Sequence, residues 1–203
     1  MCLSRPKTYL YHVLVSSKDI QEFFERVASD WDQMRLAYYD ESVIEKMAEA
    51  SNVDGDSVVA DVGTGTGFVA AGLAPRVKKV VGFDNSQAML DVARENLATL
   101  GVDNVDLVEA DVLRLPLADS DVDAAFANMV LHHAHEPTLM LAEMARVVKP
   151  GGTVAITDEV QHHYEWMHTE HADVWLGFTE EQVEWFFAEA GLQSYGYEPL
   201  GMA

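Results

Sequence analysis

The stretch Val58–Gly67, VVADVGTGTG, decides the fold of this chain. It opens with an apolar run, which is typical of a strand covered on both faces. It closes with three glycines at alternate positions, and residues without Cβ atoms let the chain turn sharply and let a ligand approach the backbone. The apolar segment Phe68–Ala74 ends before Pro75 and predicts a helix. A strand, a glycine turn and a helix in this order indicate a nucleotide-cofactor site.

The spacing of the glycines separates two kinds of cofactor. A dinucleotide fingerprint places glycines at its first, third and sixth positions. Here the glycines take the first, third and fifth positions, and the sixth is Phe68. The pattern therefore argues against a nicotinamide or flavin site. It disfavours a nicotinamide oxidoreductase, which would have to bind NAD(H).

Two acids further along the chain point to an adenosyl group. The apolar run Val80–Phe83 predicts a strand that ends in Asp84, about twenty residues beyond the first glycine, where a carboxylate can accept hydrogen bonds from ribose hydroxyls. A third strand begins at Val105–Val108 and leads to Asp111. An acid at that place can accept a hydrogen bond from an adenine amino group.

Four segments in this order resemble the class I S-adenosylmethionine-dependent methyltransferases, in particular the type 11 group that includes ubiquinone and menaquinone methylases. They are ADVGTGTG, VVGFDNSQAML, EADVLRLPLADSDVDAAFANMVLHH and ARVVKPGGTVAITD, and they span Asp54 to Asp158, roughly half of the chain. The resemblance implies S-adenosyl-L-methionine as cofactor and S-adenosyl-L-homocysteine as product. It also implies methyl transfer to a small-molecule acceptor by in-line displacement. A quinone or polyketide ring methylase is a more specific hypothesis with the same chemistry.

The resemblance places a cofactor-binding set at the ends of the first four strands. Asp61 would bind the ammonium directly or through water, Asp84 the ribose, and Asp111 the adenine. Met89 would flank the adenosine, although it is equally an ordinary core residue. The full set is Asp61, Gly63, Thr64, Gly65, Gly67, Asp84, Asn85, Met89, Asp111, Val112 and Asn128.

Histidines follow the fourth expected strand, near the predicted methyl-transfer centre. His132 or His133 can serve as a general base for an oxygen, nitrogen or activated carbon acceptor. The competing interpretation is a histidine at a helix start that bonds to backbone. Because the sulfonium is already activated, positioning and desolvation can supply most of the rate without a base.

Two segments are candidates for covering the substrate. Between Trp31 and Glu41 the sequence has no clean apolar face, and its lid candidates compete with simple packing on the core. The histidine-rich run Asp158–His171 matches no sharp metal-ligand spacing, so no metal is expected, and it is interpreted as a cover over the substrate pocket. The lid and pocket-wall candidates are Trp31, Arg35, Tyr38, Tyr39, Tyr164 and Trp166.

Alternating strands and helices predict an α/β fold with a doubly wound, mostly parallel, Rossmann-like methyltransferase sheet of the seven-stranded type. One domain is expected over residues 1–203. Its parts are a strand and helical lid (1–53), a cofactor-binding core (54–158), a substrate cover (159–178), and a C-terminal helix and strand (179–203). The resemblance implies a last, antiparallel strand for which the sequence offers no matching segment, and Thr8–Val15 is predicted to take its edge position.

Three shorter features complete the expected elements. Capping-box spacing at Ser42 and at Thr179 predicts two helix starts. Thr153–Thr157 is the expected fifth strand, and Gln193–Glu198 the sixth.

The net charge and the composition limit the classes of molecule that this protein can bind. The net charge is −21, with 34 acidic against 13 basic residues, and phosphates would be repelled by such a surface. A nucleic-acid substrate is therefore excluded, and a small molecule is expected. A single cysteine and the lack of a membrane-length apolar run favour the cytoplasm, and a homodimer is compatible with the sequence. The main alternative to an enzyme is a cofactor-binding sensor that has lost catalysis.

Overall fold

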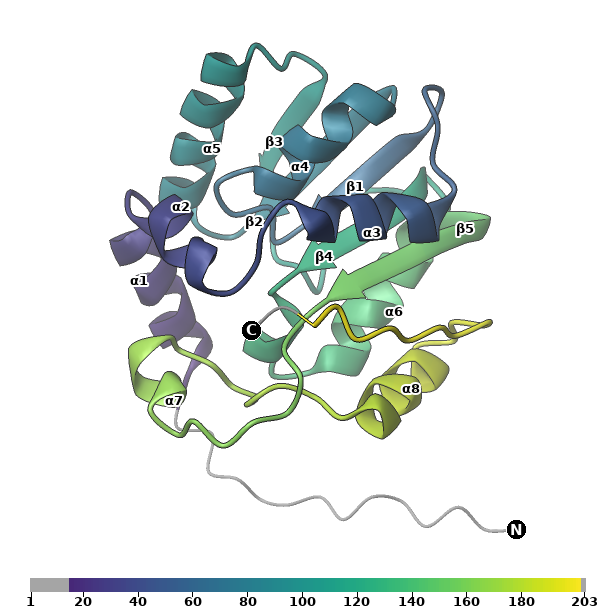
Figure 1. The fold of residues 1–203 in the computed structure, drawn as a ribbon. Coiled ribbons are helices and arrows are strands. Elements are labelled where there is room, and N and C mark those ends of the chain that lie inside the picture. Colours follow the sequence, from purple (N-terminus) through teal and green to yellow (C-terminus); the bar gives the residue numbers. More distant parts are fainter. Residues whose placement is uncertain (1–14, 202–203) are drawn as a thin grey trace, which may run out of the picture.

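Five parallel strands form one sheet in the order β3-β2-β1-β4-β5 (Figure 1). The computed structural model describes residues 15–201. The chain moves outward from β1 through β2 to β3, then crosses to the other side of β1 for β4 and β5. This reversal confirms the predicted doubly wound α/β sheet. The strands are β1 (Val58–Val62), β2 (Lys79–Asp84), β3 (Val105–Glu109), β4 (Val122–Asn128) and β5 (Val148–Thr157).

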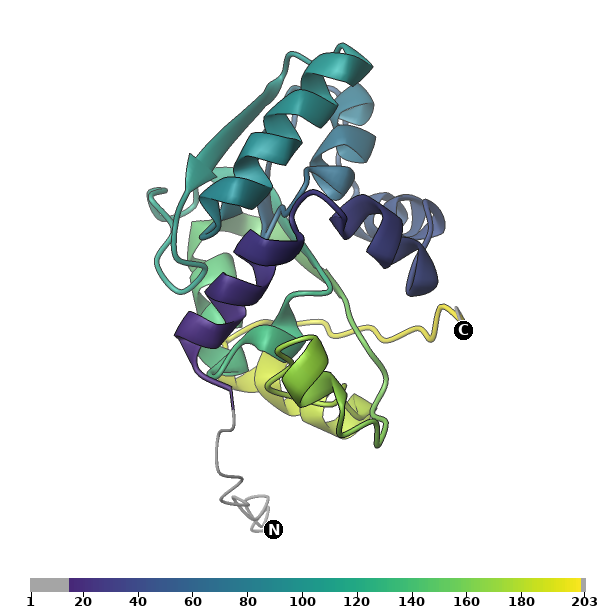
Figure 2. The same cartoon turned by 90° about the vertical axis from the view of Figure 1, so that its left-hand side faces the viewer.

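Helices cover both faces of the sheet. Crossovers between parallel strands are right-handed, so the helices after β1 and β2 lie on one face and the helix between β4 and β5 lies on the other (Figures 1 and 2). The first face carries α3 (Ser42–Ser51), α4 (Phe68–Leu73) and α5 (Gln87–Leu100), and the second carries α6 (Pro137–Val147) and α8 (Glu180–Glu189). The shorter elements are α1 (Ser17–Val27), α2 (Trp31–Met34), η1 (Arg35–Ala37), η2 (Ala74–Arg76), η3 (Leu131–His133) and α7 (Met167–Glu170).

The core has two layers because successive strand residues face opposite sides of the sheet. Val59 and Phe126 are fully buried in the cluster that includes α3 and α4. Ala60 and Ala125, one position away, belong to the cluster that includes α6 and α8. The central strands β1 and β4 are covered on both faces and are mostly apolar, whereas the edge strand β3 alternates between half-buried and exposed residues.

Capping residues explain where the longer helices begin and end. The hydroxyl of Ser86 accepts a hydrogen bond from the backbone of Met89 and caps α5, which ends at Gly101 in the left-handed conformation. Thr179 and Gln182 form the predicted capping box of α8. The helix start predicted at Thr179 is therefore confirmed.

The predicted helix start at Ser42 is confirmed, although Ser42 is the first helical residue and not the N-cap. Its backbone N–H donates to the carboxylate of Asp40 at 2.9 Å. One predicted boundary is wrong. Strand β5 begins at Val148, five residues before the predicted start at Thr153. An irregularity in the pairing with β4 lets the glycine-containing segment stay in the sheet, which a local reading takes for a turn.

The predicted strand Gln193–Glu198 is also wrong, because the structure has irregular backbone there. Ser194 lies at φ 61°, which breaks an extended run. The segment is held by side chains instead, since Glu198 pairs with Lys46 at 3.0 Å and Leu200 packs on the cluster around α3 and α4.

The proposed edge strand Thr8–Val15 falls outside the described residues, apart from Val15, and stays a prediction. None of the helices between residues 15 and 201 combines the length and apolarity needed to cross a bilayer.

Candidate active site

The glycine turn between β1 and α4 lies at the carboxyl edge of the sheet, where the strand order reverses. The backbone N–H groups of Gly63 and Thr64 both donate to the carbonyl of Phe83 at 2.8 Å, which fastens the turn to β2. Gly63 has φ 72°, and a Cβ there would run into the side chain of Val130. The turn thus requires a glycine at its first position for both backbone and space.

Asp61, the last acid of β1, is buried beneath this turn. Its side chain accepts a hydrogen bond from the Thr64 hydroxyl at 2.6 Å, and only 1% of the residue is exposed. Burial raises the pKa of Asp61 to about 7 despite the hydrogen bond from Thr64. No cationic side chain pairs with it among residues 15–201. An ammonium group of a ligand would supply the missing positive charge.

Asp84 at the end of β2 receives two backbone donors. One carboxylate oxygen accepts from Gly65 at 2.8 Å and the other from Ser86 at 2.9 Å. Burial raises the pKa of Asp84, although these donors act in the opposite direction. A Cβ added to Gly65 would meet only the indole nitrogen of Trp31, at 3.9 Å, so the turn keeps space beside its backbone. A carboxylate fixed next to an open glycine turn fits an adenosyl ligand.

The other predicted cofactor residues are less enclosed. Asp111 follows β3, is exposed, and accepts a hydrogen bond from the backbone of Leu113 at 2.9 Å. Val112 beside it is half-buried against the α6 side of the core. Asn85 is exposed, and its carbonyl accepts from Gln21 of α1 at 3.3 Å.

Met89 and Asn128 both lie inside the protein. Met89 is buried in α5, which is consistent with the core interpretation of this residue. Asn128, the last residue of β4, accepts a hydrogen bond from the hydroxyl of Thr157 at 2.7 Å. This bond joins the ends of β4 and β5.

The segment from Trp31 to Glu41 is fastened over the glycine turn. Asp32 accepts hydrogen bonds from the hydroxyl of Thr66 at 2.7 Å and from the amide of Asn96 at 2.8 Å. Sequence reasoning missed this contact, because nothing local marks Asp32 as the partner of residues 34 and 64 positions away.

Aromatic groups of the same segment reach the end of β4. Burial raises the pKa of the Tyr39 phenol to about 12, although Arg35 and the nearby side chains of Asn128 and Trp31 act in the opposite direction. The guanidinium of Arg35 stacks 3.9 Å above the ring of Phe68, and its Nη1 is buried without a partner. The lid candidates are therefore brought to the predicted methionine end of the site.

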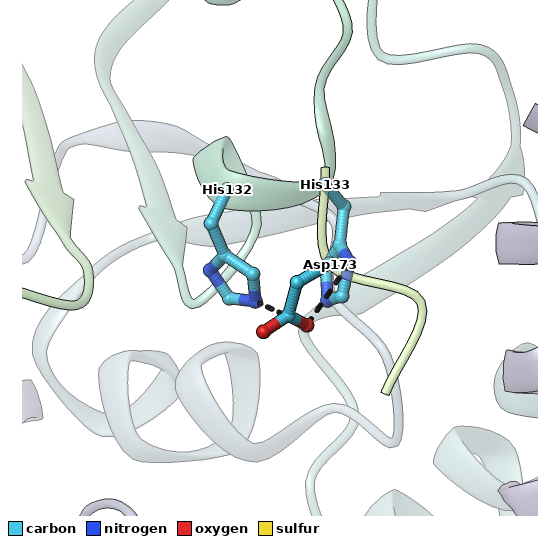
Figure 3. Close-up of side chains that lie close together, drawn as sticks. All are labelled: His132, His133 and Asp173. Atoms are coloured by element: carbon cyan, nitrogen blue, oxygen red, sulfur yellow. Dashed lines mark ion pairs between the residues drawn. The ribbon is translucent and has the colours of Figure 1, made fainter. Parts of the chain in front are cut away.

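The two predicted catalytic histidines lie together just past β4. Figure 3 shows His132 and His133 directed toward Asp173, a residue that follows α7. The Nδ1 of His132 lies 2.8 Å from Asp158, and its Nε2 lies 3.7 Å from Asp173. Burial lowers the pKa of His132, but the neighbouring carboxylates, Asp158 foremost, raise it to about 9. Burial and the adjacent His132 hold the pKa of His133 well below its usual value.

Asp173 was missed by sequence reasoning. Its side chain is buried, and neither carboxylate oxygen has a hydrogen-bond partner. Burial raises its pKa to about 6, although His132 acts in the opposite direction. The only available signal was an acid within an apolar run, which does not reveal its neighbours.

A small cavity of about 20 Å³ lies among these groups. It is bordered by lid residues, including Trp31, Tyr38 and Tyr39, and by the histidine pair. The predicted pocket walls Tyr164 and Trp166 lie outside this lining and are exposed. The cavity lining, besides the lid residues, comprises Phe23, Met129, His132, His133, Glu159, Met167, His171 and Asp173.

Comparison with known proteins agrees with this geometry. A family model described as a methyltransferase domain matches residues 60–156. This chain belongs to the class I S-adenosylmethionine-dependent methyltransferases. The matched region of the methyltransferase domain runs from β1 to β5, so it contains the glycine turn, Asp84 and the histidine pair.

Relatives of the methyltransferase domain come from several bacteria. A demethylmenaquinone methyltransferase of Clavibacter sepedonicus is 40% identical over 49% of this chain and 40% of its own length. A malonyl-[acyl-carrier protein] O-methyltransferase of Marinomonas sp. is 30% identical over 86% of this chain and 63% of its own. The crystal structure of a SAM-dependent methyltransferase from Aquifex aeolicus has a TM-score of 0.66 at 27% identity, covering 82% of this chain and 87% of that one.

The chain spans less than two thirds of the length of these curated relatives. S-adenosylmethionine is the cofactor of the family. The methyltransferase assignment is thus common to the family model and these relatives, and the fold is shared with the structure from Aquifex aeolicus.

Proposed function

We propose that this protein transfers the methyl group of S-adenosylmethionine to a small-molecule acceptor at the carboxyl edge of the sheet, between β1 and β4. The carrying observation is the buried Asp61, which lies under an open glycine turn and has no cationic partner in the described part of the chain. A ligand that brings its own ammonium to this carboxylate satisfies a charge that the protein leaves unpaired.

The chain supplies complementary groups for the rest of the cofactor. Asp84, held by two backbone donors, would accept the ribose hydroxyls, and Asp111 would accept from the adenine amino group. Asn85, Met89 and Val112 would flank the adenosine. The buried, unpartnered Nη1 of Arg35 offers a donor for the carboxylate of the methionine half.

Bound there, the cofactor supplies an activated methyl group on a sulfonium. The protein has to hold an acceptor in line with it and exclude water, which can provide most of the rate. Trp31 and Tyr39 border the small cavity beside the histidine pair and would cover that end of the site. Both ring nitrogens of His132 face carboxylates. The proposed transfer does not depend on a general base, and the role of His132 or His133 as such a base stays a prediction.

A binding experiment separates this proposal from its alternatives. Isothermal titration of the whole chain with S-adenosylmethionine and S-adenosylhomocysteine is expected to show one site per chain. Asp84→Asn should weaken both ligands about tenfold or more, because a hydrogen bond to a charged group is lost. Asp103 is an exposed acid two residues before β3, so Asp103→Asn is the matched control and should bind normally.

Release of S-adenosylhomocysteine in the presence of acceptors then tests the reaction. The names of the relatives make a demethylated menaquinone and malonyl-acyl carrier protein the first acceptors to try. Tight binding of the methylated form with no turnover on any acceptor would favour the sensor. Binding of NAD(H) instead of either ligand would refute the proposal.

A further inference from the structure

The cluster of His132, His133 and Asp173 is built by contacts between segments far apart in the sequence. The backbone N–H groups of Val174 and Trp175 both donate to the carbonyl of His132, at 3.0 and 2.9 Å. These two bonds hold Asp173 against η3. One nitrogen of each imidazole and one oxygen of the carboxylate then lie within 4.8 Å of one another.

Asp173 is buried beside the imidazoles of His132 and His133, at 3.7 and 3.9 Å, but neither imidazole donates a hydrogen bond to it. Its residue is 0% exposed, and both carboxylate oxygens are without a hydrogen bond in the described structure. An unpaired carboxylate in the interior costs several kcal/mol, so such groups normally pair with a cation or bind a metal. The Nδ1 of the neighbouring His132 is hydrogen-bonded to Asp158 at 2.8 Å, so it does not bind Asp173.

The separations are too long for hydrogen bonds and close to those between ligands of one ion. The Nε2 of His132 lies 3.7 Å from an oxygen of Asp173, and a ring nitrogen of His133 lies within 4.8 Å of the ligand atoms of both other residues. Two ligand atoms held about 2.1 Å from a tetrahedral ion are about 3.4 Å apart. Movements of roughly 1 Å or less by the side chains would therefore bring the three ligand atoms to the spacing of one ion.

The size of the adjoining cavity agrees with a single small occupant. At about 20 Å³ it is close to the minimum of about 10–15 Å³ that one water needs. An organic acceptor does not fit in that volume. A bare ion or a water bound to one does.

The surrounding hydrogen bonds are those that orient metal-binding imidazoles. Asp158 accepts from His132, and its second oxygen is fixed by the backbone N–H of Leu131 at 2.9 Å. The Nδ1 of His133 lies 3.2 Å from the carbonyl of Ala172, so a proton on this nitrogen leaves the Nε2 lone pair for an ion. Histidine ligands usually donate their other ring N–H to a carboxylate or a carbonyl in this way.

We propose that His132, His133 and Asp173 bind one divalent transition-metal ion of the zinc class. Two imidazole nitrogens and one carboxylate oxygen are ligand types that suit Zn²⁺ and Co²⁺, and three protein ligands leave a position open. The inference goes beyond the proposed methyl transfer and rests on this cluster alone.

The test uses the whole chain after removal of metal with a chelator. Titration with Zn²⁺ alone is expected to give one ion per chain, and Co²⁺ is expected to give the visible absorption of a four- or five-coordinate site. Asp173→Asn should weaken Zn²⁺ binding at least tenfold, and Asp158→Asn about 10–100-fold through the orientation of His132. His163→Gln, an exposed histidine outside the cluster, is the matched control and should leave binding unchanged.

Two results would overturn the site. One is the absence of stoichiometric binding and of the Co²⁺ spectrum in the unaltered chain, a readout that does not depend on any variant folding. The other is binding that persists in Asp173→Asn but falls in His163→Gln, which would assign the ion to surface histidines. S-adenosylmethionine binding measured on the same metal-free sample keeps this outcome separate from the proposed function.

Discussion

Replacing Asp61 with asparagine removes an ionisable group from beneath the glycine turn while keeping its size. The hydroxyl of Thr64 can still donate to the amide oxygen at the position where it now donates to the carboxylate. The variant therefore isolates the effect of the charge. Two opposite consequences are expected, a more stable protein and a weaker cofactor site.

The magnitude follows from the pKa of about 7, against a usual 3.8. A carboxyl with a raised pKa in the folded protein stabilises fully at pH values below 3.8, and this contribution is lost as the pH rises through about 7. The whole shift corresponds to roughly 4 kcal/mol of unfolding free energy, of which roughly 2–3 kcal/mol falls between pH 5 and pH 8. Asp61→Asn has no such group, so its advantage over the unaltered chain should grow by that amount over this range.

Urea unfolding at pH 5, 6, 7 and 8 measures the first consequence, and titration with S-adenosylmethionine measures the second. Binding to the unaltered chain should strengthen as the pH rises and Asp61 ionises, whereas the variant should bind about tenfold or more weakly at pH 8 without that dependence. Asp103→Asn serves as the control for a surface charge. Equal pH profiles for the unaltered chain and Asp61→Asn, or a variant that is less stable at pH 8, would refute the reasoning.

Two further substitutions test the turn and its cover. Gly63→Ala places a side chain at φ 72° and against Val130, so we expect a loss of roughly 1–3 kcal/mol in urea unfolding, and an unchanged midpoint would contradict the requirement for glycine. Asp32→Ala removes the bond from Thr66, so residues 31–41 should become more sensitive to limited proteolysis and S-adenosylmethionine should bind several-fold more weakly. Cleavage and affinity equal to those of the unaltered chain would show that the tether is unimportant.

The elements that sequence reasoning predicted well are those with strong local signals. The run before Gly63 is apolar because both faces of β1 are covered, and the capping box at Thr179 acts within one helical turn. Such features depend on residues that are close in the sequence, so they can be predicted without knowledge of the tertiary structure. The failure at Gln193–Glu198 has the same origin, since strand composition says nothing about a pairing partner.

The residues of the candidate site also fall into two groups, those that a local sequence pattern predicts and those that only tertiary contacts bring together. The family signature lies in two short segments, the glycine turn with Asp61 and the strand that ends in Asp84, so the sequence alone determined the fold class and the cofactor type. Only the tertiary structure decided that Asp32 reaches Thr66 and that Asp173 meets the histidine pair, across 34 and about 40 positions. These contacts depend on how η3, α2 and the segment after α7 pack at the sheet edge. No local periodicity or capping pattern records which buried charge will face which side chain.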